Sequence, residues 1–346
     1  MLRRAAIKAA IAGAWALALA SCNQSVGKVI YADLAPMLES SADTATRAAR
    51  PVTTRVSAFG GDLIAAIASL PQEGGVIDVD QTIYLTSTVD VRAGVELVSS
   101  VALPGNNGAN NGSTDHLQQR HILVARGVSP ALVLHSAAGI DGLFLHKEGV
   151  TFGDSSAAAF TDTAVSIAGE DAYITGCLIT GFQQAVHGHF VQRTRIVGNR
   201  IDCVNGIHLD AVFDIGRVLD NHLWPFVTVS VGTPASAWRE GTAYYFSNGG
   251  DWNHLRGNFS FGYATGYHLH NVEHVTAVQC GADSFGSDRR GVGFRITGSS
   301  KNITLIACQA AAQNIGFLNE TEGKDKPDQM IGCSHWANNR DVVGWN

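Results

Sequence analysis

A motif of about 22 residues returns along the second half of the chain and limits the fold more than any other feature. Each copy holds a short strand with apolar residues at alternate positions, such as Ile207 and Leu209, and then a second short strand. The second strands end on one column of small polar or thiol residues, spaced by 22, 22, 37, 22, 28 and 25 residues: Cys177, Asn199, Asn221, Asn258, Cys280, Cys308 and Cys333. Short strands at this period predict an all-β solenoid, because a β-propeller would need longer strands at periods of about 40 to 50 residues.

Alternation within the first strand of each coil separates inward from outward positions. The apolar residues that we expect inside are Val165, Ile167, Val186, Ile207, Leu209, Tyr244, Phe246, Tyr267, Leu269, Phe294, Ile296 and Phe317. The outward pairs between or after them are Ser166/Ala168, His187/His189, His208/Asp210, Tyr245/Ser247, His268/His270 and Arg295/Thr297. Five of the 13 histidines fall in these 12 outward positions. Since neighbouring coils lie about 4.8 Å apart, the sequence predicts one polar stripe about 20 Å long, which suits a polysaccharide.

This stripe carries the groups that β-elimination from a uronic-acid-containing exopolysaccharide requires. The reaction needs a base for the proton beside the carboxylate, a donor for the leaving oxygen and a cation for the carboxylate. We expect His208 or His268 to be the base and Tyr245 the acid, with Arg295 as the cation and Asp210 beside them. The predicted substrate-binding residues are His187, His189 and His270, together with Trp224 and Trp238 from an insertion at 224–241.

Other activities remain open. Glycoside hydrolysis needs two carboxyl groups roughly 5 to 9.5 Å apart. The stripe offers only Asp210, and Asp202, Asp214 and Asp220 lie off it, which favours a lyase over a hydrolase. A uronate epimerase shares the first half of the lyase mechanism. A non-catalytic carbohydrate-binding or adhesion solenoid is the alternative from another class, since a single outward histidine is more often plain polar surface.

A divalent metal is a further hypothesis for this stripe. The pairs His187-Gly-His189 and His268-Leu-His270 place two imidazoles on one face of a strand, as a Zn²⁺ site requires. A Ca²⁺ site built from aspartates is an equal alternative, but the sequence does not indicate its ligands.

The start of the domain resembles a known family. A short helix is expected over 62–70 with Asp62 as its cap, followed by strands at 76–79, 82–85, 89–91 and 94–97. Together with the later repeats, this order resembles pectate-lyase-superfamily proteins from about residue 55 to 346. The resemblance implies a right-handed parallel β-helix with a short N-terminal capping helix. That superfamily includes lyases, hydrolases, epimerases and phage tailspikes, and trimers among its tailspike-like members leave a homo-oligomer open.

The first 22 residues predict an export address. Arg3, Arg4 and Lys8 precede an apolar stretch that is too short for a comfortable membrane span and ends at Cys22. The segment resembles a bacterial lipoprotein signal with lipid on Cys22 and also a twin-arginine motif, which implies a Gram-negative outer membrane, periplasm or cell surface. Residues 23–54 are expected to form a tether and 55–346 the solenoid. A net charge of -6 disfavours nucleic-acid binding.

The shared column of cysteine and asparagine predicts a buried ladder. Asparagine amides can pair from coil to coil, and a free cysteine behaves as a small buried hydrophobe. We therefore expect free thiols at Cys177, Cys280, Cys308 and Cys333, although disulfides between adjacent coils are the alternative for the last three.

Overall fold

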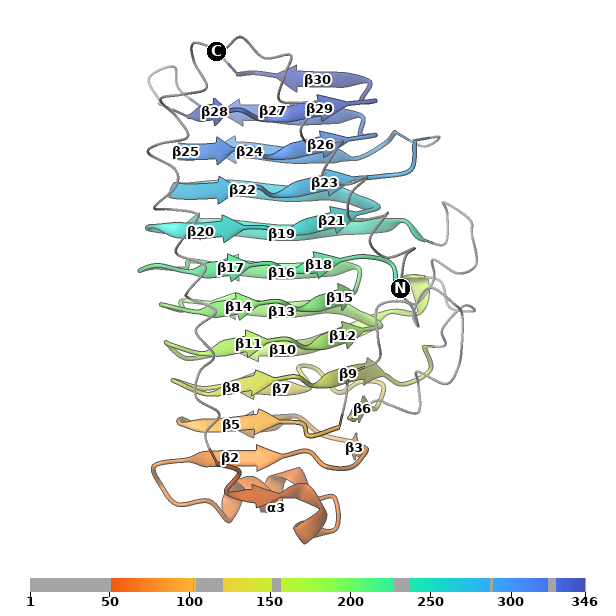
Figure 1. The fold of residues 1–346 in the computed structure, drawn as a ribbon, viewed down its shortest axis with the longest axis vertical. Coiled ribbons are helices and arrows are strands. Elements are labelled where there is room, and N and C mark those ends of the chain that lie inside the picture. The colour runs from red at the N-terminus through yellow and green to blue at the C-terminus, as the bar shows by residue number, and fades with distance from the viewer. Residues whose placement is uncertain are drawn as a thin grey trace, which may run out of the picture. The chain divides into compact units, whose positions relative to one another are not determined.

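The computed structural model describes residues 51–101, 103, 121–150, 157–226, 237–286, 289–322 and 328–345. Within the unit Val52–Asn346, successive coils lie on top of one another, and each coil contributes one strand to each of three sheets (Figure 1). All strand pairings among the described residues are parallel, for example Ile179 with Ile201, His187 with His208 and Ile196 with Val218. The predicted all-β parallel β-helix is confirmed.

The sheets are named A, B and C, and the chain passes through them in the order B, C, A in each coil. Sheet A contains β1 (Thr54–Arg55), β2 (Gly75–Asp78), β5 (Val95–Val98), β8 (Gly139–Asp141), β11 (Tyr173–Thr175), β14 (Arg195–Val197), β17 (Arg217–Leu219), β20 (Asn253–Arg256), β25 (Lys301–Ile306) and β28 (Gln329–Ile331). Sheet B contains β3 (Ile83–Leu85), β6 (Ile122–Val124), β9 (Phe144–Lys147), β12 (Leu178–Thr180), β15 (Arg200–Asp202), β18 (His222–Leu223), β21 (Phe259–Phe261), β23 (Gly281–Asp283), β26 (Gln309–Ala311) and β29 (Ser334–Trp336). Sheet C contains β4 (Val89–Val91), β7 (Leu132–Leu134), β10 (Thr161–Ile167), β13 (Phe182–His189), β16 (Asn205–Asp210), β19 (Arg239–Gly249), β24 (Val292–Gly298), β27 (Ile315–Thr321) and β30 (Arg340–Val343). The long strand β22 (Tyr263–Val278) pairs in sheet C through its first half and in sheet A through its second half.

Only the first strand of sheet B was expected from the sequence, as the predicted strand at 82–85 that forms β3. Its strands are mostly three or four residues long and begin directly after the ladder residue, as β12 does after Cys177. Such short strands carry too few alternations to be separated from a turn.

A short helix lies at the N-terminal end of the stack, as expected. Helix α3 (Leu63–Ala68) follows the 3-10 turn η2 (Val56–Phe59), and a second such turn, η4 (Ala157–Ala159), lies farther along the chain. The side chain of Asp62 caps α3 by accepting a hydrogen bond from the Ala65 backbone N–H at 2.9 Å. Leu63, Ala66 and Ile67 are buried in the core, so the helix covers the apolar interior of the first coils.

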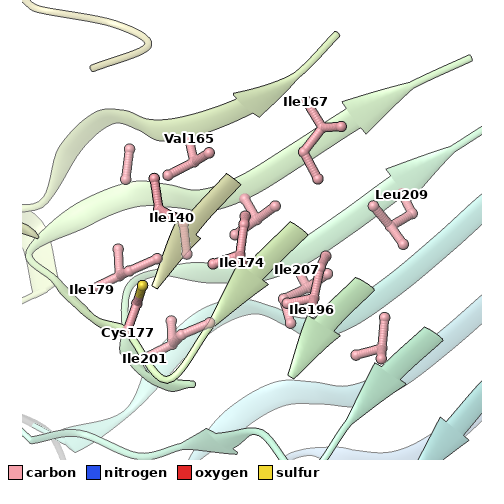
Figure 2. Packing of buried hydrophobic residues seen from close by; sticks show 14 of the residues in the cluster. Ile140, Val165, Ile167, Ile174, Cys177, Ile179, Ile196, Ile201, Ile207 and Leu209 are labelled. Atoms are coloured by element: carbon pink, nitrogen blue, oxygen red, sulfur yellow. The ribbon is translucent and has the colours of Figure 1, made fainter. Parts of the chain in front are cut away.

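The interior is filled by columns of side chains that repeat from coil to coil. Figure 2 shows members of these columns, among them Val165, Ile207 and Leu209 from sheet C and Ile174 and Ile196 from sheet A. The sheet C column then becomes an aromatic stack of Tyr244, Tyr267, Phe294 and Phe317, with ring centroids 4.7, 4.4 and 5.0 Å apart. The two buried tyrosine hydroxyls donate to backbone carbonyls, so neither is left unsatisfied.

The predicted ladder is also present. Asn199 and Asn221 each accept a hydrogen bond from the backbone N–H of the preceding ladder residue, at 2.8 and 3.0 Å, and donate to a backbone carbonyl and to the next ladder residue. The chain reaches the ladder through a tight bend in which Gly257 has a φ of +63°, a conformation that favours glycine. The four ladder cysteines are free, as is Cys203, which confirms the predicted thiols.

Several sequence predictions concern residues that lie wholly or partly outside the described ranges. The export signal with Cys22, residues 23–50 of the tether and most of the loop after residue 103 lie outside the described residues. The insertion predicted at 224–241 is shorter, because β19 already begins at Arg239; its residues 227–236 are also outside the described part. Within the described residues, no helix is long and apolar enough to cross a membrane.

Replacing Asn221 by alanine should destabilise the solenoid by at least about 2 kcal/mol. The change removes the partner of several buried groups, and each group left unsatisfied costs about 1–3 kcal/mol. Urea unfolding of the variant measures this loss. The control is Cys177→Ala, which keeps the backbone N–H that Asn199 binds and should cost about 1 kcal/mol. Equal losses for the two variants would show that the amide ladder does not hold the coils together.

Candidate active site

Two files of side chains run along the outer face of sheet C. Strand pairing places Ser166, His187, His208, Tyr245, His268 and Arg295 at equivalent positions of successive coils, and these residues form the first file. The second file lies two residues farther along each strand and contains His189, Asp210, Ser247, His270, Thr297 and Glu320. The two files together are called the stripe. The register that alternation predicted is therefore confirmed, although it does not by itself assign a role to any residue.

The rings of the first file stack on one another. The centroid of Tyr245 lies 4.4 Å from that of His208 and 4.8 Å from that of His268, with interplanar angles of 17° and 15°. His187 continues the row at 5.1 Å from His208, in a tilted arrangement. Tyr245 is therefore held between two imidazoles that belong to the coils before and after it.

Burial keeps these imidazoles neutral. It lowers the pKa of His208 to about 4, with a smaller contribution from His187, while the charge of Asp210 acts in the opposite direction. Burial likewise lowers the pKa of His268 to about 4, helped by Arg295 and His270. The pKa of His187 is also lowered, mainly by burial. At neutral pH these rings carry lone pairs that can accept protons.

Asp210 is the centre of a hydrogen-bond cluster in the second file. Its carboxylate accepts hydrogen bonds from the Ser247 hydroxyl at 2.7 Å and the Asn248 amide at 2.9 Å, and His189 Nδ1 lies 2.7 Å away. Burial opposes ionisation, but these hydrogen bonds outweigh it and lower the pKa of Asp210. Ser247 Oγ also lies 3.1 Å from His208 Nε2, so the cluster reaches the stacked rings.

A second cluster surrounds Thr297. Its hydroxyl oxygen lies 2.9 Å from His268 Nε2 and 2.8 Å from His270 Nδ1. The other ring nitrogen of His270 accepts a hydrogen bond from the Asn271 amide at 3.0 Å. The amide of Asn271 also donates to Asn248 Oδ1 at 3.2 Å, which joins the two clusters.

Arg295 was expected to be available to a substrate carboxylate, but in the structure it forms an ion pair with Glu320. Its Nε and Nη2 atoms each lie 3.0 Å from Glu320 Oε2. The statement that Asp210 is the stripe's only carboxylate was wrong, since Glu320 occupies the second file. Extending the match of Phe294 with Phe317 by three residues would have found it. Four coil steps separate Glu320 from Asp210, or about 20 Å, which is too far for a hydrolytic pair.

The aspartates near the stripe in sequence have arginine partners elsewhere. Asp202 is buried against Arg239, with Oδ1 to Nη2 at 2.6 Å. Asp214 pairs with Arg193 at 3.0 Å, and Asp220 lies 3.7 Å from Arg256. None of these three carboxylates lies in either file.

The two tryptophans that were expected to bind substrate lie apart from the stripe. Trp224 follows β18 of sheet B and packs against Phe259 and Phe261, with centroids 6.4 and 4.4 Å away. Trp238 is only 5% exposed and lies under the guanidinium of Arg290 at 4.2 Å. A buried ring offers no surface to a sugar.

A different group of aromatic residues lies beside the stripe and was not singled out from the sequence. Phe190, Phe213 and Trp252 come from three successive coils, at the turns that lead from sheet C to sheet A, and are 69%, 39% and 62% exposed. We call them the aromatic row. Phe190 lies 4.5 Å from His189, and Phe213 lies 6.1 Å from Phe190, so the row begins at the second file. In sequence, each of these residues follows a residue of the second file by one to five positions. Because the turns differ in length, this spacing shows no regular period.

The described residues of the stripe do not form a set of ligands for the predicted metal ion. Among the described residues, no group of three or more His, Cys, Asp or Glu side chains is placed to hold a metal ion. Both ring nitrogens of His270 already have hydrogen-bond partners, at Thr297 and Asn271. A Zn²⁺ or Ca²⁺ requirement stays a prediction.

The chain matches no protein-family model and no curated protein. Solved structures with some similarity include DFA-IIIase from Arthrobacter chlorophenolicus A6 in complex with GF2, at 14% identity and a TM-score of 0.44 over 86% of this chain and 92% of that chain. They also include its mutant C387A in complex with DFA-III, at 14% identity and 0.47 over 82% and 84%. The catalytic domain of a GH87 alpha-1,3-glucanase in complex with nigerose gives 9% identity and 0.42 over 79% and 61%. Likeness at this level assigns no activity, and the resemblance to the pectate-lyase superfamily stays a prediction.

We expect His208 and His268 to titrate near pH 4 in the folded chain. A histidine in the unfolded chain takes up its proton at about pH 6.5, so the unfolded state binds more protons than the folded state between these values. Folding stability should therefore fall as the pH drops from about 6.5 to 4. Imidazole NMR titration, with resonances assigned by His208→Gln and His268→Gln, gives the midpoints. Midpoints between pH 6 and 7 would show that burial does not control these rings.

Proposed function

We propose that the outer face of sheet C binds an acidic polysaccharide and cleaves it by β-elimination. The observation that carries this proposal is the stack of His208, Tyr245 and His268, in which neutral imidazoles flank a phenol. The stripe has groups that can accept and donate protons, but it lacks the close pair of carboxyl groups that glycoside hydrolysis requires. It therefore suits proton abstraction better. We choose uronic-acid polysaccharides as the substrate class because the carboxylate makes the proton on its neighbouring carbon acidic enough to remove.

In the proposed reaction, one imidazole beside Tyr245 takes the proton from the carbon next to the uronate carboxylate. The electron pair of that C–H bond becomes the new carbon–carbon double bond, and the bond from the neighbouring carbon to the leaving glycosidic oxygen breaks. The Tyr245 hydroxyl gives its proton to that oxygen. The products are an unsaturated uronate end and a new hydroxyl end, with no water consumed.

Arg295 supplies the cation in this proposal. Its present partner, Glu320, is about half exposed, and exposed ion pairs contribute only about 0–1 kcal/mol. A substrate carboxylate can therefore compete for the guanidinium at little cost. Arg295 adjoins His268 in the first file, which places positive charge on the side of Tyr245 that faces away from Asp210.

A non-catalytic carbohydrate-binding solenoid is the second candidate, and the aromatic row favours it. Large exposed rings beside hydrogen-bonding groups suit the apolar faces and hydroxyl edges of sugars. Phe190 and Trp252 have φ values of 53° and 58°, a backbone conformation that costs a bulky residue about 1–3 kcal/mol. These rings pack on neighbouring rings at 4.5 to 6.4 Å but keep much of their surface exposed, and a bound sugar would cover that surface.

We further propose that the protein works outside the cytoplasm, held by lipid on Cys22. The signal-like segment 1–22 is the support for this location. Release of a Cys22→Ser variant from the membrane fraction tests it, and unchanged membrane attachment would contradict it.

The full chain incubated with uronic-acid polysaccharides should raise the ultraviolet absorbance of unsaturated uronate ends. His208→Gln should lower this rate at least about 100-fold, the usual contribution of a positioned base. The matched control is His254→Gln on sheet A, which also removes an imidazole whose pKa is lowered mainly by burial and should leave the rate unchanged. Reducing ends without absorbance would identify a hydrolase, and a changed uronate configuration an epimerase. Addition of EDTA to the same assay shows whether a divalent metal is needed.

Trp252→Ala should weaken polysaccharide binding and leave turnover unchanged. Loss of one aromatic stacking contact, worth about 0.5–1.5 kcal/mol, corresponds to a rise in KM of about 2- to 12-fold. The control is Trp336→Ala, since Trp336 is 51% exposed but lies on sheet B. An unchanged KM for Trp252→Ala would exclude the row from substrate binding. Wild-type binding in a co-sedimentation assay without any cleavage would identify the non-catalytic alternative.

A further inference from the structure

The hydrogen bonds behind the stripe have a direction, and that direction separates two histidines that look equivalent in sequence. We propose that the network holds His208 and His268 in opposite tautomers, so that His208 presents an unprotonated Nδ1 and His268 presents an Nδ1–H. The catalytic roles that follow rest on the proposed function, whereas the tautomers follow from the hydrogen bonds alone.

The tautomer of His208 is set by Asp210. An ionised carboxylate only accepts, so the Ser247 hydroxyl must donate its single hydrogen to Asp210 Oδ1 at 2.7 Å. Ser247 Oγ can then only accept from His208 Nε2 at 3.1 Å. The proton of neutral His208 therefore resides on Nε2, and Nδ1 keeps the lone pair. Hydrogen bonds from Asn248 and His189 hold Asp210 in its ionised form.

The tautomer of His268 is set from the opposite end of the network. The Ser299 backbone N–H donates to Asn271 Oδ1 at 2.9 Å, which fixes the orientation of that amide. Asn271 Nδ2 therefore donates to His270 Nε2, and the proton of neutral His270 lies on Nδ1. His270 Nδ1–H donates to Thr297 Oγ1 at 2.8 Å, and the Thr297 hydroxyl hydrogen has His268 Nε2 as its acceptor at 2.9 Å. The proton of His268 then resides on Nδ1.

Both Nδ1 atoms are open to a ligand. Within the described part of the chain, neither atom has a hydrogen-bond partner, and neither is among the buried polar atoms that lack one. Some surface of each atom is thus in contact with solvent. The stripe presents an acceptor on one side of Tyr245 and a donor on the other.

This arrangement divides the work of the proposed elimination. His208 becomes the base, and the imidazolium that it forms lies in the same cluster as the negative charge of Asp210. His268 donates its Nδ1–H to the substrate carboxylate, on the side where Arg295 lies. A sugar carbon above Tyr245 can direct its hydrogen to one side and its carboxylate to the other. Ser247 and Thr297 act as positioning residues.

Nitrogen-15 NMR of histidine-labelled full-length protein at neutral pH tests the tautomers directly. His208→Gln and His268→Gln assign the two rings by loss of their signals. We expect an Nε2–H form for His208 and an Nδ1–H form for His268. The same tautomer at both positions, or the reverse assignment, would overturn the proposal.

Thr297 provides the matched pair of variants. Thr297→Val keeps the shape but removes the hydroxyl, so His268 should become a mixture of tautomers, while Thr297→Ser should retain the Nδ1–H form. In the elimination assay, Thr297→Val should lower kcat about tenfold, as loss of one hydrogen bond does, and Thr297→Ser should restore it. An unchanged His268 tautomer in Thr297→Val would show that Thr297 does not set it.

The two proposals fail separately. Opposite tautomers without cleavage of any uronate polysaccharide would refute the lyase and leave the hydrogen-bond assignment standing. Cleavage that depends on His208, with His268 in the Nε2–H form, would refute the assignment and leave the lyase standing.

Discussion

The register of parallel strands from coil to coil is the constraint on which the rest of this structure depends. Each strand hydrogen-bonds to its equivalent in the next coil, so residues that are 20 to 43 positions apart become direct neighbours, as His208 and Tyr245 are. A shift of one residue in any coil would turn its inward column outward. The buried Asn ladder opposes such a shift, because its amides bind specific backbone groups of the adjacent coils. Fold and candidate site therefore depend on the same alignment.

The stripe has an electrical polarity along the solenoid. Asp210, in an ionised state, lies beside the His208 end of the ring stack, and Arg295 lies beside the His268 end. Tyr245 sits between them, held at stacking distance from both rings. A reaction that moves negative charge from a carbon towards a carboxylate benefits from this arrangement, because fixed charges and dipoles need no reorganisation when the reaction occurs.

Much of the site could be predicted because its register was set by residues other than the site residues. Because Ile207 and Leu209 point inward, His208 between them must point outward. The alternation of inward and outward residues places Tyr245 and His268 in the same way. Glu320 was missed because the register was not extended beyond Phe317. The aromatic row was missed for a different reason: Phe190 and Trp252 lie in turns, whose lengths vary and carry no period. The hydrogen-bond partners of Asp210 and Thr297 depend on side-chain geometry, which alternation does not encode.

The ladder changes from amide to thiol after Asn258, between the coils that carry Tyr245 and His268. Asn221 and Asn258 close the coils that carry His208 and Tyr245, and their amides bind both neighbouring coils. Cys280 and Cys308 close the coils that carry His268 and Arg295. Their thiols make weaker contacts, to carbonyls at 3.4 to 3.6 Å and, for Cys280, to the Asn258 amide at 3.9 Å. The coils of His208 and Tyr245 are thus joined at the ladder by amide hydrogen bonds, whereas those of His268 and Arg295 are joined there by weaker thiol contacts. In the proposed elimination, the residues that transfer protons therefore belong to amide-linked coils and those that bind the carboxylate to thiol-linked coils.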